Sequence, residues 1–153
     1  MNIKEVTSKD LKKIIELESM VFGKDAFSED LIKKLIKENL FFFKLEKSGI
    51  KKLLIGFVIV IIDQKDCANI INFLINPKYQ NKGYGSCLLN QTILRIKEFD
   101  KVKKIILNVN INNSSAIKLY EKFGFRIIKT INNYYHLKDS AYLMELAFNN
   151  RIT

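Results

Sequence analysis

The chain has 153 residues, of which 48% are hydrophobic and 27% charged, and its formal net charge is +10. This length and composition predict one globular domain, residues 1–153, with a core of its own. The longest apolar run, Leu53 to Ile62, is about half the length of a membrane-spanning helix, and the N-terminus lacks the pattern of a signal peptide. We therefore expect a cytoplasmic protein that does not bind membranes.

The basic residues are spread along the chain, and only three of them are arginines. Because no nucleic-acid-binding motif is present, we expect no sequence-specific recognition of DNA or RNA. The charge would still attract a polyanion, whether RNA, an anionic cofactor or an acidic partner. Cys67 and Cys87 have neither the spacing of metal ligands nor that of a disulfide framework, so no metal is expected.

The first half of the chain predicts two helices and four strands. Apolar residues recur at helical spacing after Thr7 or Ser8, either of which can cap a helix that ends at Gly23. A second helix opens at Ser28, with an apolar inner face and lysines on its outer face. The strands are Asn2 to Val6, Phe41 to Glu46, Leu53 to Ile62 and Asn69 to Ile75.

The second half predicts two helices that alternate with strands. The first helix follows a glycine-bearing loop and continues to about Phe99. The second spans Ser115 to Phe123, with Asn113 among its candidate caps, and stops at Gly124. The strands are Ile105 to Val109, Phe125 to Thr130 and Ala141 to Phe148. This order of elements indicates an α+β domain with a mostly antiparallel sheet and one parallel crossover.

The loop Gln80 to Gly85 lies between the strand Asn69 to Ile75 and the helix that starts at Ser86. Backbone N–H groups at a helix N-terminus have no intrahelical partner and face the positive end of the helix dipole, so this loop can bind a pyrophosphate. Gly83 and Gly85 allow a tight turn and a close approach of ligand to backbone. The spacing excludes a Rossmann or Walker motif, but an ordinary strand-to-helix turn remains an alternative.

Two motifs and the order of elements resemble a known family. The first motif is P-x-Y-Q-x-x-G-x-G, from Pro77 to Gly85. The second is N-N-S-S-A-I-x-L-Y-E-K-F-G-F, from Asn112 to Phe125, followed by N-Y-Y from Asn133 to Tyr135. They resemble the GNAT N-acetyltransferase superfamily, and within it the protein N-terminal acetyltransferases of the ribosomal-protein alanine type. The likeness is close from about Ile70 to the end and thin before it.

The resemblance implies the GNAT fold, a mixed and mostly antiparallel central sheet of six to seven strands flanked by about four helices. It also implies acetyl-CoA as the cosubstrate and direct transfer of the acetyl group, in a ternary complex, to the N-terminal α-amine of a protein. No covalent enzyme intermediate is implied, because neither cysteine lies at a matched position.

The resemblance further implies which residues bind acetyl-CoA. Backbone amides of the glycine loop would hold the pyrophosphate, and the end of the strand would pair with the pantetheine arm, where one amide would stabilise the oxyanion. Two residues at the start of the next helix would contact the middle of the cofactor. The implied cofactor-binding residues are Phe73, Leu74, Ile75, Gln80, Asn81, Lys82, Gly83, Tyr84, Gly85, Ser86, Asn113, Ser115 and Tyr120.

Tyr120 and Asn108 are the implied catalytic residues. Tyr120 matches the tyrosine near the CoA sulfur, where a phenol can donate a proton to the departing thiolate. The alternative for Tyr120 is a core residue at helical spacing from Ile117 and Phe123. Asn108 departs from the family, because many relatives have a glutamate or histidine there as the proposed general base. An amide cannot take that proton, so Asn108 is interpreted as holding an ordered water or as a structural strand residue.

The loss of this base affects amines unequally. An α-amine with a pKa near 8 is about one-tenth uncharged at pH 7, whereas a lysine amine near 10.4 is uncharged at roughly one part in a few thousand. An enzyme without a strong base therefore suits an N-terminal α-amine better than a lysine side chain.

The implied peptide-binding residues are largely aromatic. Tyr134 and Tyr135 would form walls of the peptide slot, with Phe27 of the early loop facing them and Ile71 lining the same slot. The alternative for the two tyrosines is a hydrophobic loop anchor. His136 lies in the same loop and has a pKa suited to a base near neutrality, but a lone loop histidine is often simply solvated.

Three other hypotheses stay open. The chain could acetylate a lysine or a small-molecule amine, it could bind CoA without catalysis, or its basic surface could bind RNA or the ribosome. For the N-terminal acetyltransferase, an auxiliary subunit or an association with the ribosome would be the partners.

Overall fold

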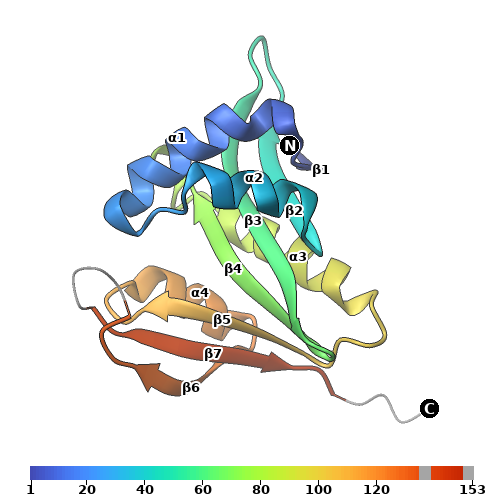
Figure 1. The fold of residues 1–153 in the computed structure, drawn as a ribbon, viewed down its shortest axis with the longest axis vertical. Coiled ribbons are helices and arrows are strands. Elements are labelled where there is room, and N and C mark those ends of the chain that lie inside the picture. Colours follow the sequence, from blue (N-terminus) through green and yellow to red (C-terminus); the bar gives the residue numbers. More distant parts are fainter. Residues whose placement is uncertain (135–138, 150–153) are drawn as a thin grey trace.

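The computed structural model describes residues 1–134 and 139–149 as one seven-stranded sheet in the order β1-β2-β3-β4-β5-β7-β6 (Figure 1). The strands are β1 (Asn2–Glu5), β2 (Phe41–Lys47), β3 (Leu53–Gln64), β4 (Cys67–Ile75), β5 (Lys104–Asn110), β6 (Arg126–Ile131) and β7 (Ala141–Ala147). Among these, β4 and β5 are parallel and every other neighbouring pair is antiparallel. The mixed, mostly antiparallel sheet confirms the α+β prediction.

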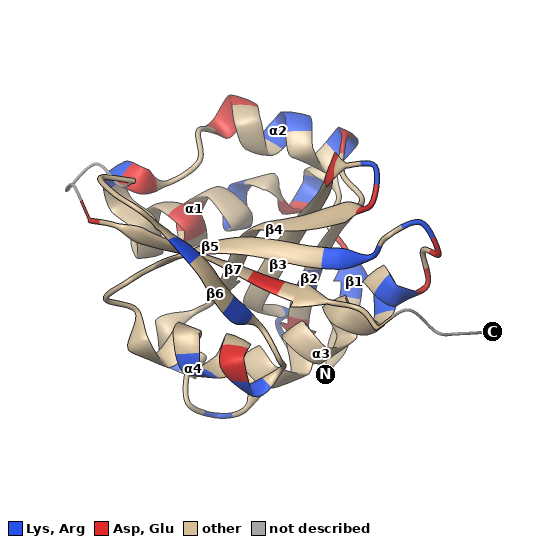
Figure 2. Cartoon of the chain, turned by 90° about the horizontal axis from the view of Figure 1, so that it is seen from below, with Lys and Arg blue, Asp and Glu red and all other residues tan. Residues whose placement is uncertain are grey.

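Four α-helices and three short 3₁₀ turns complete the described chain. The helices are α1 (Leu11–Phe22), α2 (Glu29–Lys37), α3 (Tyr84–Lys97) and α4 (Ser114–Lys122), and the turns are η1 (Ser8–Asp10), η2 (Gly23–Asp25) and η3 (Pro77–Tyr79). In Figure 2, α1 and α2 cover one face of the sheet and α3 and α4 the other, and basic residues lie on both faces. Of the helices described, none has the length and apolar character that crossing a membrane requires.

Local capping explains where the helices begin. The Ser28 hydroxyl accepts a hydrogen bond from the Leu31 amide and opens α2, and the Asn113 side chain accepts one from the Ala116 amide and opens α4. Both starts agree with the sequence analysis. Thr7 caps η1 instead of α1, because the Asp10 carboxylate accepts the Thr7 backbone N–H and closes a 3₁₀ turn before the α-helix begins.

The two faces of the sheet have separate cores. Buried residues of α1 and α2, including Leu17 and Ile32, pack with Phe57 and Leu74 of the sheet. Buried residues of α3 and α4 pack with the opposite sheet face. Burial of these apolar faces, at about 25 cal/mol per Å² removed from water, is what holds the helices on the sheet.

Strands β4 and β5 separate part-way along their length (Figure 1). Their pairing ends at Ile70 opposite Leu107, although β4 continues to Ile75 and β5 to Asn110. Beyond this point β4 still pairs with β3, so one backbone edge of residues 71–75 has no strand partner in the described chain. We call this opening the split.

A β-bulge lies at the start of the split. Val60 of β3 is opposite Ile70 and the preceding residue, Ile59, is opposite Asn72, so Ile71 has no partner on β3. The bulge reverses the alternation of side chains: Ile70 belongs to the α3/α4 core and Leu74 to the α1/α2 core, although the two are an even number of residues apart. The sequence analysis did not predict this reversal.

Candidate active site

The loop that follows β4 is tied to the end of that strand. The Gln80 side chain donates a hydrogen bond of 3.1 Å to the Ile75 carbonyl, and the Asn76 side chain accepts one of 3.0 Å from the Lys78 amide. Asn81 and Gly83 have left-handed backbones, with φ of 62° and 84°. These contacts turn the chain sharply, so that α3 begins beside the split.

The first turn of α3 has no side-chain cap. Gly83 is the N-cap residue and supplies no side-chain cap, so the first amides of the helix keep their donors available. A Cβ on Gly85 would lie 3.3 Å from Leu119 Cδ2 of α4 and 3.7 Å from Ile75 Cγ1 of β4. The first turn of α3, the C-terminal end of β4 and α4 therefore meet at this glycine.

Asn108 and Tyr134, both predicted site residues, are in contact. The Asn108 Nδ2 donates a hydrogen bond of 3.3 Å to the Tyr134 hydroxyl. The Asn108 Oδ1 is buried and has no hydrogen-bond partner among the described residues. Tyr134, which follows β6, thus contacts β5 at the split, and its predicted role as a wall of the peptide slot stays a prediction.

Tyr120 is a buried residue of α4 that reaches the split. Its ring centroid lies 6.0 Å from that of Phe73 on β4 and 5.7 Å from that of Phe125, both in edge-on geometry. The core packing that the sequence analysis gave as an alternative is therefore present. The same packing places the residue beside β4 in the split, so its predicted role at the cofactor sulfur stays a prediction.

The sequence analysis missed a buried carboxylate, Glu18 of α1, which is 1% exposed. One of its oxygens accepts a hydrogen bond of 2.9 Å from the Phe27 backbone amide, and the other accepts one of 2.7 Å from the Asn72 Nδ2. Burial raises the pKa of Glu18, although the two hydrogen bonds act in the opposite direction. The signal in the sequence is a carboxylate inside the apolar stripe of a helix, four residues after Ile14.

Other predicted residues are placed as follows. Phe27 and Ile71 both pack against the α1/α2 core. The Asn113 side chain caps α4, and the Ser115 hydroxyl lies 3.5 Å from it. The predicted contacts of Asn113 and Ser115 with the cofactor stay predictions. The remaining two peptide-slot residues, Tyr135 and His136, lie outside the described residues.

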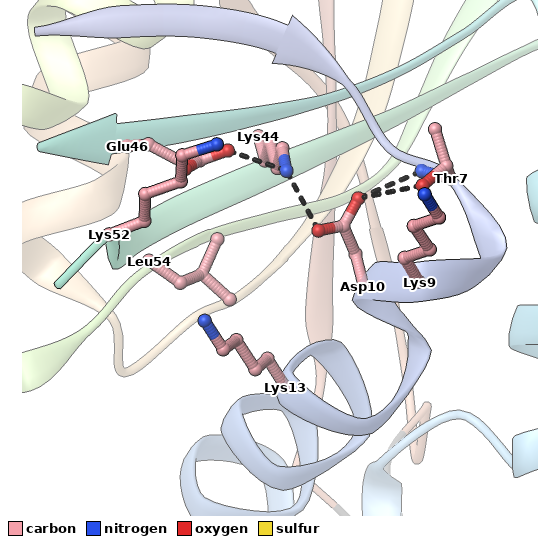
Figure 3. A pocket seen from close by; sticks show the side chains of 8 residues that line it. All are labelled: Thr7, Lys9, Asp10, Lys13, Lys44, Glu46, Lys52 and Leu54. Carbon is pink, nitrogen blue, oxygen red and sulfur yellow. Dashed lines mark hydrogen bonds and ion pairs between the residues drawn. The ribbon is translucent and has the colours of Figure 1, made fainter. Parts of the chain in front are cut away.

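A separate cavity of about 220 Å³ lies between η1, β2 and β3 (Figure 3). Lys44 forms ion pairs there with Asp10, at 2.7 Å, and with Glu46. Burial alone would lower the pKa of Lys44, but hydrogen bonds to the two carboxylates raise it. None of the predicted site residues lines this cavity. We assign a structural role to the ion pairs of Lys44, because the pair with Asp10 holds η1 against β2.

Comparison with known proteins identifies the family. The model of the acetyltransferase (GNAT) family matches residues 9–125. The chain belongs to this family. The split and the α3 N-terminus are therefore parts of a GNAT domain.

Curated relatives match part of this GNAT chain. An N-alpha-acetyltransferase of Sulfurisphaera tokodaii is 33% identical over 76 residues, which are 50% of this chain and 46% of the relative. A spermine/spermidine N(1)-acetyltransferase of Bacillus subtilis is 43% identical over 54 residues, which are 35% of this chain and 36% of the relative. The chain thus matches about half the length of the first and about a third of the second.

Solved structures match the whole domain. Ard1 from Thermoplasma volcanium has a TM-score of 0.87 at 24% identity and covers 97% of this chain and 98% of its own. The ribosomal-protein-S18-alanine N-acetyltransferase from Escherichia coli has a TM-score of 0.80 at 26% identity, with 99% of each chain covered. The predicted GNAT fold is confirmed.

The residues of this site fit acetyl-CoA. The free edge of residues 71–75 offers backbone donors and acceptors for an extended amide-containing chain, and the glycine-capped helix offers amides for a diphosphate. Lys82, a residue of the loop, adds a cation, with its Nζ 5.9 Å from the centre of the Tyr79 ring. The net charge of +10 also favours this polyanion.

Proposed function

We propose that this protein is an acetyl-CoA-dependent N-acetyltransferase that acts on the N-terminal α-amine of a protein. The observation that carries the proposal is the split, because it joins a free strand edge, a glycine-capped helix and the Asn108–Tyr134 contact in a GNAT domain. Acetyl-CoA, when bound, supplies an acetyl group activated as a thioester.

The chain would bind the diphosphate and the pantetheine arm of acetyl-CoA with different elements. The first amides of α3 and the loop from Gln80 to Gly85 bind the diphosphate, since they present unpaired N–H groups at the positive end of the helix dipole. The free edge of Phe73, Leu74 and Ile75 pairs with the pantetheine amides. Tyr120 lies beside Phe73, where its phenol can donate to the sulfur that leaves.

The chemistry of the site favours an α-amine as acceptor. Asn108 supplies no base, so the reacting nitrogen has to be uncharged before it binds productively. About one-tenth of an α-amine is uncharged at pH 7, a fraction roughly two hundred times that of a lysine amine. The N-alpha-acetyltransferase relatives agree with this choice.

A small polyamine is the second candidate acceptor, and the spermine/spermidine N(1)-acetyltransferase match is the observation in its favour. The formal charge of +10 opposes it, because a polycationic acceptor would be repelled by the field of the whole chain. The same field suits a substrate presented near ribosomal RNA, so association with the ribosome, directly or through an auxiliary subunit, is part of the proposal.

The test uses acetyl-CoA with short peptides that have a free N-terminus and one internal lysine, with spermidine assayed in parallel. Fragmentation mass spectrometry locates the added acetyl group. We expect acetylation of the first residue, with preference for particular leading residues. Acetylation of lysine or spermidine alone would replace the proposed acceptor, and cofactor binding without any product would indicate a CoA-binding module.

A further inference from the structure

Two amide oxygens at the start of the split lack hydrogen-bond partners. They are the Oδ1 atoms of Asn72 on β4 and Asn108 on β5, and both are buried with no partner among the described residues. A buried acceptor left unpaired costs about 1–3 kcal/mol, so native proteins rarely keep one without a functional or structural reason. Because both unpaired oxygens lie where β4 and β5 separate, one explanation should account for the two of them.

The orientation of Asn72 is set by Glu18. Both Glu18 oxygens act as acceptors, one for the Phe27 amide and one for the Asn72 Nδ2. Because the Asn72 Nδ2 faces Glu18, the Asn72 Oδ1 points to another side. Glu18 therefore determines that the oxygen, and not the nitrogen, of the Asn72 amide is left without a partner among the described residues. Its other hydrogen bond joins Glu18 to Phe27, in the loop between α1 and α2.

Asn108 is oriented in a comparable way, and on the same face of the sheet. Its Nδ2 donates to the Tyr134 hydroxyl, which leaves the Oδ1 as the unpaired atom. Its neighbours Leu107 and Val109 belong to the α3/α4 core, so the Asn108 side chain lies on the opposite, α1/α2 face. Asn72 contacts Glu18 of α1 and lies on this face as well.

The two residues also lie at matching depth. Ile70 and Leu107 form the last pair between β4 and β5. Asn108 is the next residue on β5, and Asn72 is the second residue after the pair on β4, just past the bulge. Two buried acceptors without a described partner thus flank the point where the strands separate.

We propose that the Oδ1 atoms of Asn72 and Asn108 accept the two N–H bonds of the uncharged acceptor amine, and that Glu18 is the positioning residue for Asn72. The inference rests on the proposed acetyltransfer. An uncharged primary amine has two N–H bonds and one lone pair, so two acceptors bind both N–H groups and leave the lone pair free to attack. An ammonium group must first lose its third proton to solvent.

The bond changes balance without a further reactant. The nitrogen lone pair forms a C–N bond with the thioester carbonyl carbon while the C–S bond breaks. The proton lost by the nitrogen is matched by the proton that the departing thiolate takes up, so the products are an amide and a thiol. Amide oxygens are uncharged, so they stabilise an ammonium less than a carboxylate would and keep the uncharged amine populated.

Two sets of variants test the positioning of the amine. Glu18→Gln places an amide N–H₂ against Asn72, which must turn its oxygen toward that donor and its nitrogen toward the substrate. The double variant Glu18→Gln/Asn72→Asp restores an acceptor on both sides. At the second position, Asn108→Leu removes the acceptor, and Asn108→Asp is the matched control that retains one.

The assay compares kcat/KM for a peptide with a primary N-terminal amine and for the same peptide with an N-methylated first residue, which has one N–H fewer. Calorimetry of acetyl-CoA binding checks that each variant is folded. We expect Glu18→Gln and Asn108→Leu to lower kcat/KM for the primary amine about tenfold and to reduce the preference over the N-methyl peptide, as one lost hydrogen bond predicts. The double variant and Asn108→Asp retain an acceptor, so both should recover the preference for the primary amine. Their carboxylates also change the charge of the site, so the readout for these two variants is the ratio of kcat/KM between the two peptides.

The outcomes separate the two proposals. Should the wild-type protein acetylate no amine, the proposed function fails and the inference falls with it. An active wild type whose preference for the primary amine is unchanged in Glu18→Gln and Asn108→Leu would overturn the inference alone, because a merely structural role lowers both rates equally. If Glu18→Gln does not bind acetyl-CoA, the comparison of Asn108→Leu with Asn108→Asp tests the inference, by the ratio of kcat/KM for the primary-amine peptide to kcat/KM for the N-methyl peptide.

Discussion

Replacing Gly56 by alanine should distort the strand that borders the split. Gly56 of β3 pairs with Ile75 of β4, next to a bulge between β2 and β3. A Cβ at this position would lie 2.3 Å from the Leu74 carbonyl oxygen, 2.8 Å from Ile75 Cδ1 and 3.2 Å from Ile75 Cα. The first and third of these atoms belong to the backbone, so rotation of a side chain cannot relieve the overlap and β4 has to move.

The size of the effect follows from this geometry. Adding a methyl group to a packed interior costs about 1–3 kcal/mol, and a clash with backbone belongs near the upper end of that range. For a domain of this size each kcal/mol lowers Tm by about 2–4 °C, so we expect Gly56→Ala to lower Tm by roughly 6–12 °C. Affinity for acetyl-CoA should fall too, because Leu74 and Ile75 form the free edge of the split.

Thermal unfolding by circular dichroism and calorimetry of acetyl-CoA binding measure both effects. Gly49→Ala is the matched control, since its Cβ would meet only the Lys51 carbonyl oxygen, at 3.7 Å, and we expect its Tm and affinity to equal the wild-type values. A Gly56→Ala protein with wild-type Tm and wild-type affinity would refute the reasoning, because it would show that β4 accommodates the methyl group without cost.

Three further predictions concern the loop, the sulfur site and acid stability. Gly83→Ala should weaken acetyl-CoA binding and lower Tm by a few degrees. The new Cβ would have no atom within 4 Å, but an L-residue at φ of 84° costs about 1–2 kcal/mol in backbone strain. An unchanged affinity would show that this loop is not part of the cofactor site. Tyr120→Phe should keep acetyl-CoA affinity but lower kcat about 10- to 100-fold, and an unchanged kcat would assign the tyrosine to the core alone. Burial would raise the pKa of Asp10, but hydrogen bonds from Lys44 and Thr7 outweigh it and the pKa lies below 3.8. Its carboxylate therefore stabilises the fold above the unfolded pKa, and this contribution is lost as the pH falls through the folded pKa. In urea unfolding, Asp10→Asn should be less stable than wild type at pH 6, with the difference closing below pH 3.8, and a constant difference would contradict the assignment.

The sequence alone predicted most of the fold because its signals are local. Helical spacing, the caps Ser28 and Asn113, and the glycines that end or begin helices act within a few residues, and the structure confirms these helices. The two GNAT motifs lie in the segment matched by the family model, so the fold could be predicted from them. The exception, η1 in place of a first helical turn, depends on the local contact between Thr7 and Asp10.

The tertiary structure decided the parts of the site that depend on pairing between distant segments. The bulge at Ile71 reverses which side chains face α1, and no alternation of residues within β4 could reveal it, since its register is defined against β3. The position of Glu18 in the apolar stripe of α1 hints at burial, but its two hydrogen-bond partners, Phe27 and Asn72, are brought to it only by the packing of α1 on the sheet. A sequence thus determines which elements form, whereas burial and register, which arise only when those elements pack together, determine which polar atoms remain for a substrate.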